Sequence, residues 1–125
     1  FRPNFTILIS PVITMELPYA HKGSRDNLLG ENPPEFLVKK FSCEQQVDST
    51  TPPAFIVHAM DDNGVNCMNS IFYFAALKKN GKENKSSLHI YAGGKHNIGL
   101  RYNPPSTNTW SELAELWLKE ISILP

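Results

Sequence analysis

The chain has 125 residues, of which 41% are hydrophobic and 10% aromatic, so it can bury one core and is typical of a globular domain. Twelve Lys and Arg residues balance twelve Asp and Glu residues, which argues against nucleic acid or an anionic membrane surface as a partner. Its two cysteines lack metal or redox spacing, and no apolar run approaches the length of about 20 residues that a membrane span requires.

The first expected element is a strand at residues 5–10, an apolar and β-branched run that ends at Pro11. Its nearly continuous hydrophobicity predicts a strand that is covered on both faces. Residues 14–51 have a different character, with a short capped helix expected over 24–30 and a second helix that opens at Pro33 and Pro34 and runs to Phe41. We interpret this segment as an excursion from the sheet near the substrate side, with a pure packing role as an equal alternative.

Two further strands are expected at residues 54–60 and 87–91, the first after two prolines and the second before Gly93 and Gly94. A helix is expected between them, ending near Gly81. Its expected buried face consists of Met68, Ile71, Phe72 and Ala75. Strand, helix and strand form a βαβ unit, so the predicted fold class is α/β with a mainly parallel sheet and flanking helices.

A closing helix is expected to start at a capping box formed by Thr109 and Glu112. Its apolar face consists of Trp110, Leu113, Ala114, Trp117 and Ile121. Together these elements predict one domain, which divides into a strand at 1–13, the helical excursion at 14–51 and a strand-helix-strand-helix segment at 52–125.

The first candidate for chemistry is the acidic pair Asp61 and Asp62, in the loop directly after the second strand. Loops at the carboxyl ends of parallel strands are where α/β active sites assemble. The structural alternative is that one of these carboxylates caps the following helix or forms an Asx turn before Gly64. This local pattern alone leaves both interpretations open.

The second candidate is His96, in the glycine-containing loop after the third strand. A histidine held by a carboxylate can accept a proton from a hydroxyl and return it to a leaving group. The alternative is an inert surface histidine, but the two loops follow strands one βαβ unit apart, which favours a joint site. His58 and His89 are expected to pack in or near the core, and neither they nor His21 are assigned a catalytic role.

The order of these motifs resembles the α/β-hydrolase superfamily. Its acetyl-esterase and acetylxylan-esterase-like branch is similar to the chain at residues 11–15 (Pro-Val-Ile-Thr-Met), 21–24 (His-Lys-Gly-Ser), 27–30 (Asn-Leu-Leu-Gly) and 52–59 (Pro-Pro-Ala-Phe-Ile-Val-His-Ala). The family's acid stands in a His-Gly-x-x-Asp-x-x-Val-Pro pattern, which falls on Asp62 with Val65, and Asp61 is the fallback. Its histidine falls on His96, although the usual Gly-Gly-His-Gly is here Gly-Gly-Lys-His-Asn.

The resemblance implies the C-terminal part of a serine esterase that acts on short acyl esters, chiefly acetyl esters of a carbohydrate or similar alcohol, without cofactor or metal. No Gly-x-Ser-x-Gly occurs in the chain, so the nucleophilic serine, the oxyanion loop and further strands are expected to precede residue 1, and residues 1–125 alone are expected to be inactive. The unpaired edge from Phe5 to Ser10 is then expected to drive self-association.

The alternatives are a noncatalytic α/β binding module, a lipase or a peptidase. No nucleic acid or membrane partner is expected, and the compartment, cytoplasmic or exported, stays open.

Overall fold

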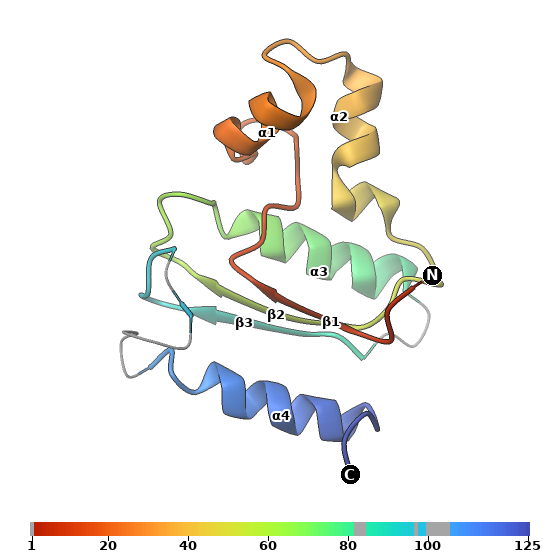
Figure 1. The fold of residues 1–125 in the computed structure, drawn as a ribbon, viewed down its shortest axis with the longest axis vertical. Helices are drawn as coiled ribbons and strands as arrows, with labels where there is room; N and C mark the ends of the chain where they lie inside the picture. Colours follow the sequence, from red (N-terminus) through yellow and green to blue (C-terminus); the bar gives the residue numbers. More distant parts are fainter. Residues whose placement is uncertain (1, 82–84, 97, 100–105) are drawn as a thin grey trace.

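A computed structural model describes residues 2–81, 85–96, 98, 99 and 106–125. Three parallel strands form one sheet in the order β1 (Thr6–Ile9), β2 (Ala54–Ala59) and β3 (Ser87–Tyr91). Figure 1 shows α3 (Met68–Asn80) over one face of the sheet and α4 (Trp110–Glu120) over the other. The predicted α/β class with a parallel sheet is confirmed.

The central strand β2 is the only one of the three in which every residue is buried. Its side chains alternate between two apolar clusters, because successive residues of a strand point to opposite faces. Phe55, Val57 and Ala59 pack with Trp117 and other residues of α4, whereas Ala54 and Ile56 pack with residues of α3. This two-sided burial accounts for the continuous apolar run that predicted the strand.

The expectation that the first strand is covered on both faces was wrong for the described part of the chain. Ile7 and Ile9 are 39% and 38% exposed. The register places Ile7 beside Phe55, on the face that α4 covers, but of the described strands only β2 pairs with β1. Apolar composition indicates that a strand can be buried, but whether it is buried depends on the elements that lie beside it. The other outer strand, β3, is likewise only partly buried.

The helix predicted between the second and third strands is α3, but its buried face was predicted wrongly. Ala75 is exposed, whereas Leu77 is buried and Tyr73 and Phe74 pack against its cluster. Two polar residues, Asn69 and Ser70, are fully buried in the first turn. A search for apolar periodicity misses this face, because part of it is polar and is stabilised by hydrogen bonds.

The closing helix α4 starts at Trp110 as predicted, and its buried residues Trp110, Ala114 and Trp117 belong to the predicted face. The predicted capping box is not formed. Thr109 has helical backbone angles and no side-chain cap bond, and its hydroxyl instead donates to the carbonyl of Ser106 at 3.2 Å. A residue that is already helical points its side chain away from the N–H groups of the first turn.

The excursion contains α1 (Lys22–Leu29), α2 (Glu35–Phe41) and the 3₁₀ turn η1 (Cys43–Gln46), which lie on the α3 side of the sheet (Figure 1). Helix α1 starts two residues before the predicted position because the His21 ring, at the N-cap, accepts a hydrogen bond from the backbone N–H of Ser24. No helix among the described residues is long and apolar enough to cross a membrane.

Asn69 of α3 anchors the base of the excursion. Its side-chain oxygen accepts hydrogen bonds from the backbone N–H groups of Ile13 and Thr14, both at 2.9 Å. Its amide nitrogen donates to the carbonyls of Tyr19 and Asn66, also at 2.9 Å. This one side chain therefore satisfies four backbone groups and fixes the path by which the chain leaves β1.

Candidate active site

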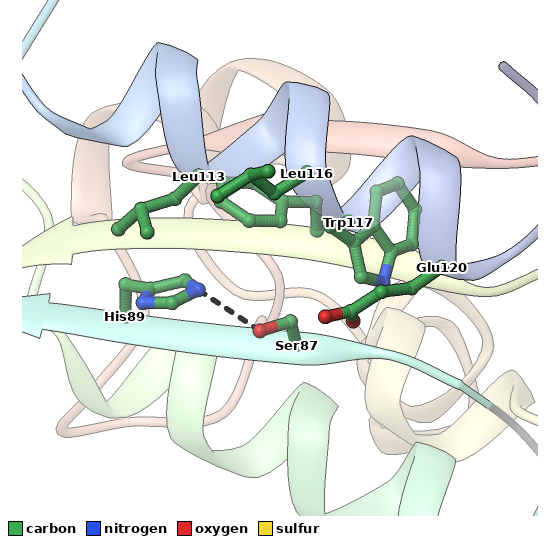
Figure 2. A pocket seen from close by; sticks show the side chains of 7 residues that line it. Ser87, His89, Leu113, Leu116, Trp117 and Glu120 are labelled. Atoms are coloured by element: carbon green, nitrogen blue, oxygen red, sulfur yellow. Dashed lines mark hydrogen bonds between the residues drawn. The ribbon is translucent and has the colours of Figure 1, made fainter. Parts of the chain in front are cut away.

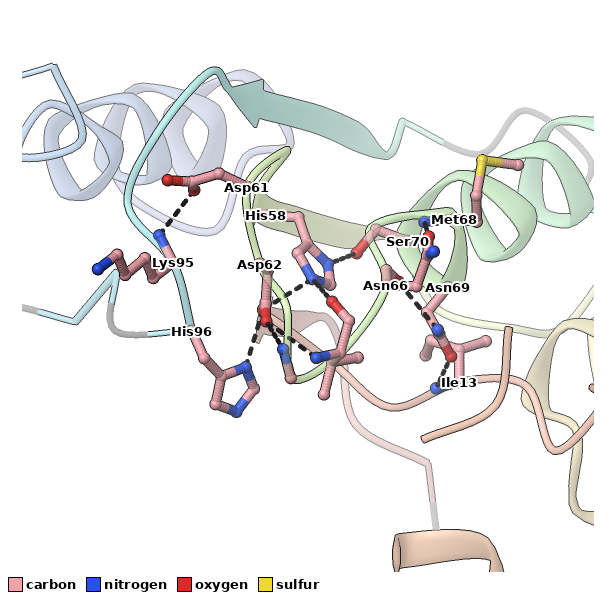
Figure 3. Close-up of polar contacts among 12 residues, drawn as sticks. Ile13, His58, Asp61, Asp62, Asn66, Met68, Asn69, Ser70, Lys95 and His96 are labelled. Atoms are coloured by element: carbon pink, nitrogen blue, oxygen red, sulfur yellow. Dashed lines mark hydrogen bonds and ion pairs between the residues drawn. The ribbon is translucent and has the colours of Figure 1, made fainter. Parts of the chain in front are cut away.

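The structure brings Asp62 and His96 together at the carboxyl ends of β2 and β3 (Figure 3). Nδ1 of His96 lies 2.8 Å from Oδ2 of Asp62, and the two residues are 34 positions apart in the chain. The Asp62 side chain is fully buried, whereas that of His96 is 53% exposed. Because an ionised carboxylate only accepts hydrogen bonds, Nδ1 carries the proton and Nε2 keeps its lone pair for a second reactant.

The two oxygens of Asp62 have different partners. Oδ1 accepts hydrogen bonds from the backbone N–H groups of Gly64 and Val65, both at 2.9 Å, which is the Asx turn that we considered as an alternative. Oδ2 is left for His96. Burial alone would raise the pKa of Asp62, but the hydrogen bonds from His96, Val65 and Gly64 outweigh it and hold the pKa below its ordinary value.

The neighbouring carboxylate, Asp61, has a separate task. Its Oδ1 accepts a hydrogen bond from the backbone N–H of Lys95 at 2.8 Å, and it is exposed. Asp61 thus ties the loop after β2 to the loop after β3, one residue before His96. Asp62 therefore contacts the imidazole of His96, whereas Asp61 accepts a hydrogen bond from the backbone of the preceding residue.

The turn before His96 requires glycine at Gly94. This residue has φ +149°, and a Cβ at its position would lie 2.7 Å from Cγ2 of Ile98 and 3.2 Å from Cγ2 of Thr107. Ile98 is buried, so it cannot move aside without opening the core cluster that it shares with β2 and α4. The close approach at Gly94 therefore sets where the following His96 can lie.

One residue of the site was missed as such by the sequence analysis. His58 was expected to be a packed core histidine, and it is fully buried, but its Nε2 also lies 3.2 Å from Oδ2 of Asp62. Its Nδ1 lies 2.7 Å from Oγ of Ser70 in α3. The available signal was the histidine that opens the His-Gly-x-x-Asp pattern, which falls on His58 when Asp62 is the acid, and a buried imidazole needs hydrogen-bonding partners.

A separate pocket of about 140 Å³ lies between β3 and α4 (Figure 2). Ser87, His89 and Glu120 line it together with apolar side chains, and Ser87 Oγ lies 2.9 Å from His89 Nε2. Residues two apart on a strand share a face, so this contact follows from the strand geometry. Burial lowers the pKa of His89. No group of three or more His, Cys, Asp or Glu side chains able to hold a metal occurs among the described residues.

The parallel sheet, the helices on both of its faces and the acid-histidine pair at the strand ends are features of an α/β-hydrolase fold. The family model of the prolyl oligopeptidase family matches residues 10–122. The chain therefore belongs to the prolyl oligopeptidase family.

Two curated relatives have names that refer to xylan. The chain is 37% identical to an acetylxylan esterase of Xylanibacter ruminicola, over 96% of this chain and 24% of the relative. It is 36% identical to endo-1,4-beta-xylanase B of Butyrivibrio fibrisolvens, over 88% of this chain and 17% of the relative. The chain thus spans about a quarter or less of the length of these relatives.

Solved structures are similar to nearly the whole chain. An acetyl ester-xyloside bifunctional hydrolase from Caldicellulosiruptor lactoaceticus matches with a TM-score of 0.92 and 39% identity, over 99% of this chain and 44% of the other. The carboxylesterase Cest-2923 from Lactobacillus plantarum matches with a TM-score of 0.79 at 22% identity, over 98% of this chain and 46% of the other, and at that identity shows the fold alone. The resemblance to acetylxylan-esterase-like α/β-hydrolases is confirmed.

Proposed function

We propose that Asp62 and His96 are the acid and the base of a serine ester hydrolase whose nucleophile lies on a segment outside residues 1–125. The observation that carries this proposal is a buried carboxylate on Nδ1 of a half-exposed histidine, at the ends of neighbouring parallel strands. In this arrangement the imidazole is oriented from within the protein and presents Nε2 outward. That is the orientation a general base needs.

The proposed chemistry uses His96 twice. Nε2 accepts the proton of the serine hydroxyl as the serine oxygen attacks the ester carbonyl, and the resulting imidazolium is stabilised by Asp62. Nε2 then donates the proton to the leaving alcohol, which breaks the ester bond and leaves an acyl-serine. Water attacks the acyl group in the second half of the cycle, with His96 again accepting and returning the proton.

The proposed substrates are short acyl esters, chiefly acetyl esters of a carbohydrate or similar alcohol. The names of the acetylxylan esterase and of the acetyl ester-xyloside hydrolase support this class, at 37% and 39% identity. A peptidase activity is the second candidate, because the matching family is that of prolyl oligopeptidases. The noncatalytic module loses support, because its discriminating feature was a wide separation of Asp62 and His96, and these residues are in hydrogen-bond contact.

A chimera tests this function. Residues 1–125 would replace the equivalent 44% of the Caldicellulosiruptor hydrolase, and p-nitrophenyl acetate and a proline p-nitroanilide would be compared as substrates. We expect acetate hydrolysis that falls about 10⁶-fold in His96→Ala and about 10⁴-fold in Asp62→Asn, the effects of the equivalent changes in serine protease triads.

His89→Gln is the matched control, since this second strand histidine has no contact with Asp62 among the described bonds. The chain alone is expected to show no His96-dependent turnover. A chimera whose acetate hydrolysis is the same with and without the His96 imidazole would refute the proposal, and a preference for the anilide would favour the peptidase.

We further propose that the isolated chain associates through β1. Ile7 and Ile9 expose apolar side chains on a strand that pairs, among the described residues, with β2 alone. Such a strand edge presents unpaired backbone groups to another chain.

A further inference from the structure

We propose that His58 is a positioning residue, which together with Ser70 holds the Asp62 carboxylate in the orientation that His96 requires. This inference rests on the proposed roles of Asp62 and His96. It concerns two residues, in β2 and α3, that are both fully buried and therefore out of reach of a substrate.

The contacts determine which ring nitrogen of His58 carries the proton. Nε2 lies 2.9 Å from the carbonyl oxygen of Val65 and 3.2 Å from Oδ2 of Asp62, and both of these groups are acceptors. Nε2 must therefore be the donor. Nδ1 of the neutral ring is then an acceptor, and the hydroxyl of Ser70 at 2.7 Å is its donor.

A serine, a histidine and an aspartate in this order resemble a second triad, but burial argues against that. Ser70 and His58 are each 0% exposed, so no ester can approach the hydroxyl. The direction of the chain is instead inward to outward, from Ser70 through His58 to Asp62 and then to the half-exposed His96. Figure 3 shows these side chains following one another from α3 to the loop after β3.

The alternative is that His58 is a core histidine whose hydrogen bonds only satisfy its buried ring nitrogens and do not orient Asp62. Against this, His58 bonds the same oxygen, Oδ2, that receives the Nδ1 proton of His96. Oδ1 is held by two backbone N–H groups, so the donor on Oδ2 completes the restraint on rotation of the carboxylate. Without His58, Asp62 would keep its turn but lose the contact that fixes Oδ2 toward His96 from the protein interior.

Two variants of similar polarity separate these possibilities. In His58→Gln the amide nitrogen can reach the place of Nε2 and donate to Asp62, whereas in His58→Asn the shorter amide reaches only the place of Nδ1. The readout is the ring-nitrogen chemical shifts of His96 in the full 125-residue chain, which report its tautomer. We expect a single Nδ1–H tautomer in the parent and in His58→Gln, and a mixture of tautomers in His58→Asn.

His89→Asn is the control for loss of a strand histidine, and its His96 shifts are expected to match the parent. An unchanged His96 tautomer in a folded His58→Asn would overturn the proposal. If that variant does not fold, Ser70→Ala decides, because removal of one oxygen frees Nδ1 of His58. A second His96 tautomer there supports the proposal, and an unchanged His96 refutes it.

In the chimera, His58→Asn is expected to lower kcat about 10- to 100-fold with KM unchanged, by analogy with the loss when outer hydrogen-bond partners of metal-ligating histidines are removed. An equal loss in His58→Gln would contradict positioning through Nε2. The tautomer measurement needs no turnover, so it can fail while the esterase proposal stands, and the reverse also holds.

Discussion

Replacement of Gly94 by alanine tests whether the turn before His96 is dictated by close packing. A Cβ at this position would lie 2.7 Å from Ile98 Cγ2 and 3.4 Å from Ala59 Cβ, on a backbone with φ +149°. Overpacking of a core costs about 1–3 kcal/mol, and a side chain in a sparsely allowed backbone region costs about 1–3 kcal/mol. Since part of both costs is relieved by the same backbone shift, we expect a loss of about 2–4 kcal/mol in the free energy of unfolding.

Urea denaturation followed by circular dichroism measures this loss, and Gly93→Ala is the matched control. A Cβ at Gly93 would meet only Oδ2 of Asp61, at 3.6 Å, which is an ordinary contact. Its free energy of unfolding is expected to change by less than about 1 kcal/mol, the usual size of a Gly-to-Ala change at a compatible position. Equal stability of the two variants would refute the argument that close approach at Gly94 determines the turn.

Three other predictions concern Asn69, the loss of stability at acid pH through Asp62, and the edge of β1. Asn69→Ala leaves two buried N–H groups unpaired and is expected to lower the free energy of unfolding, measured by urea denaturation, by about 3 kcal/mol. Asn66→Ala removes one exposed side-chain hydrogen bond, from the N–H of Met68, and is expected to cost about 1 kcal/mol. Equal losses would contradict the anchoring role. Because folding lowers the pKa of Asp62, the unfolded chain binds more protons than the folded chain below about pH 4, and the free energy of unfolding falls as the pH drops. In an acid titration of stability, Asp62→Asn should show a shallower fall than the parent. Identical slopes would refute this. Sedimentation should show that the parent chain associates and that Ile7→Lys shifts it toward monomer. If Ile7→Lys associates as strongly as the parent, association does not occur through the edge of β1.

Local sequence patterns were sufficient to predict the alternation of strands and helices and the loops that carry the candidate site. The predicted third strand has the bounds of β3, Ser87–Tyr91, and the predicted closing helix begins where α4 does, at Trp110. These features depend on local periodicity, which the chain carries within each short segment. Because parallel neighbouring strands end at the same edge of a sheet, the sequence placed the Asp61–Asp62 pair near His96, and the resemblance to α/β-hydrolases selected Asp62.

Tertiary packing decides which residues of β1 and α3 are buried, and it decides which contacts hold the candidate site in place. The exposure of Ile7 depends on which elements lie beside β1, and the buried face of α3 depends on the partners of Asn69 and Ser70. The link from His58 to Asp62 exists because the turn after β2 brings the carboxylate back over the imidazole. Local periodicity shows at which spacing apolar side chains recur along one segment. A hydrogen bond between buried polar groups instead depends on chain segments that only folding brings together.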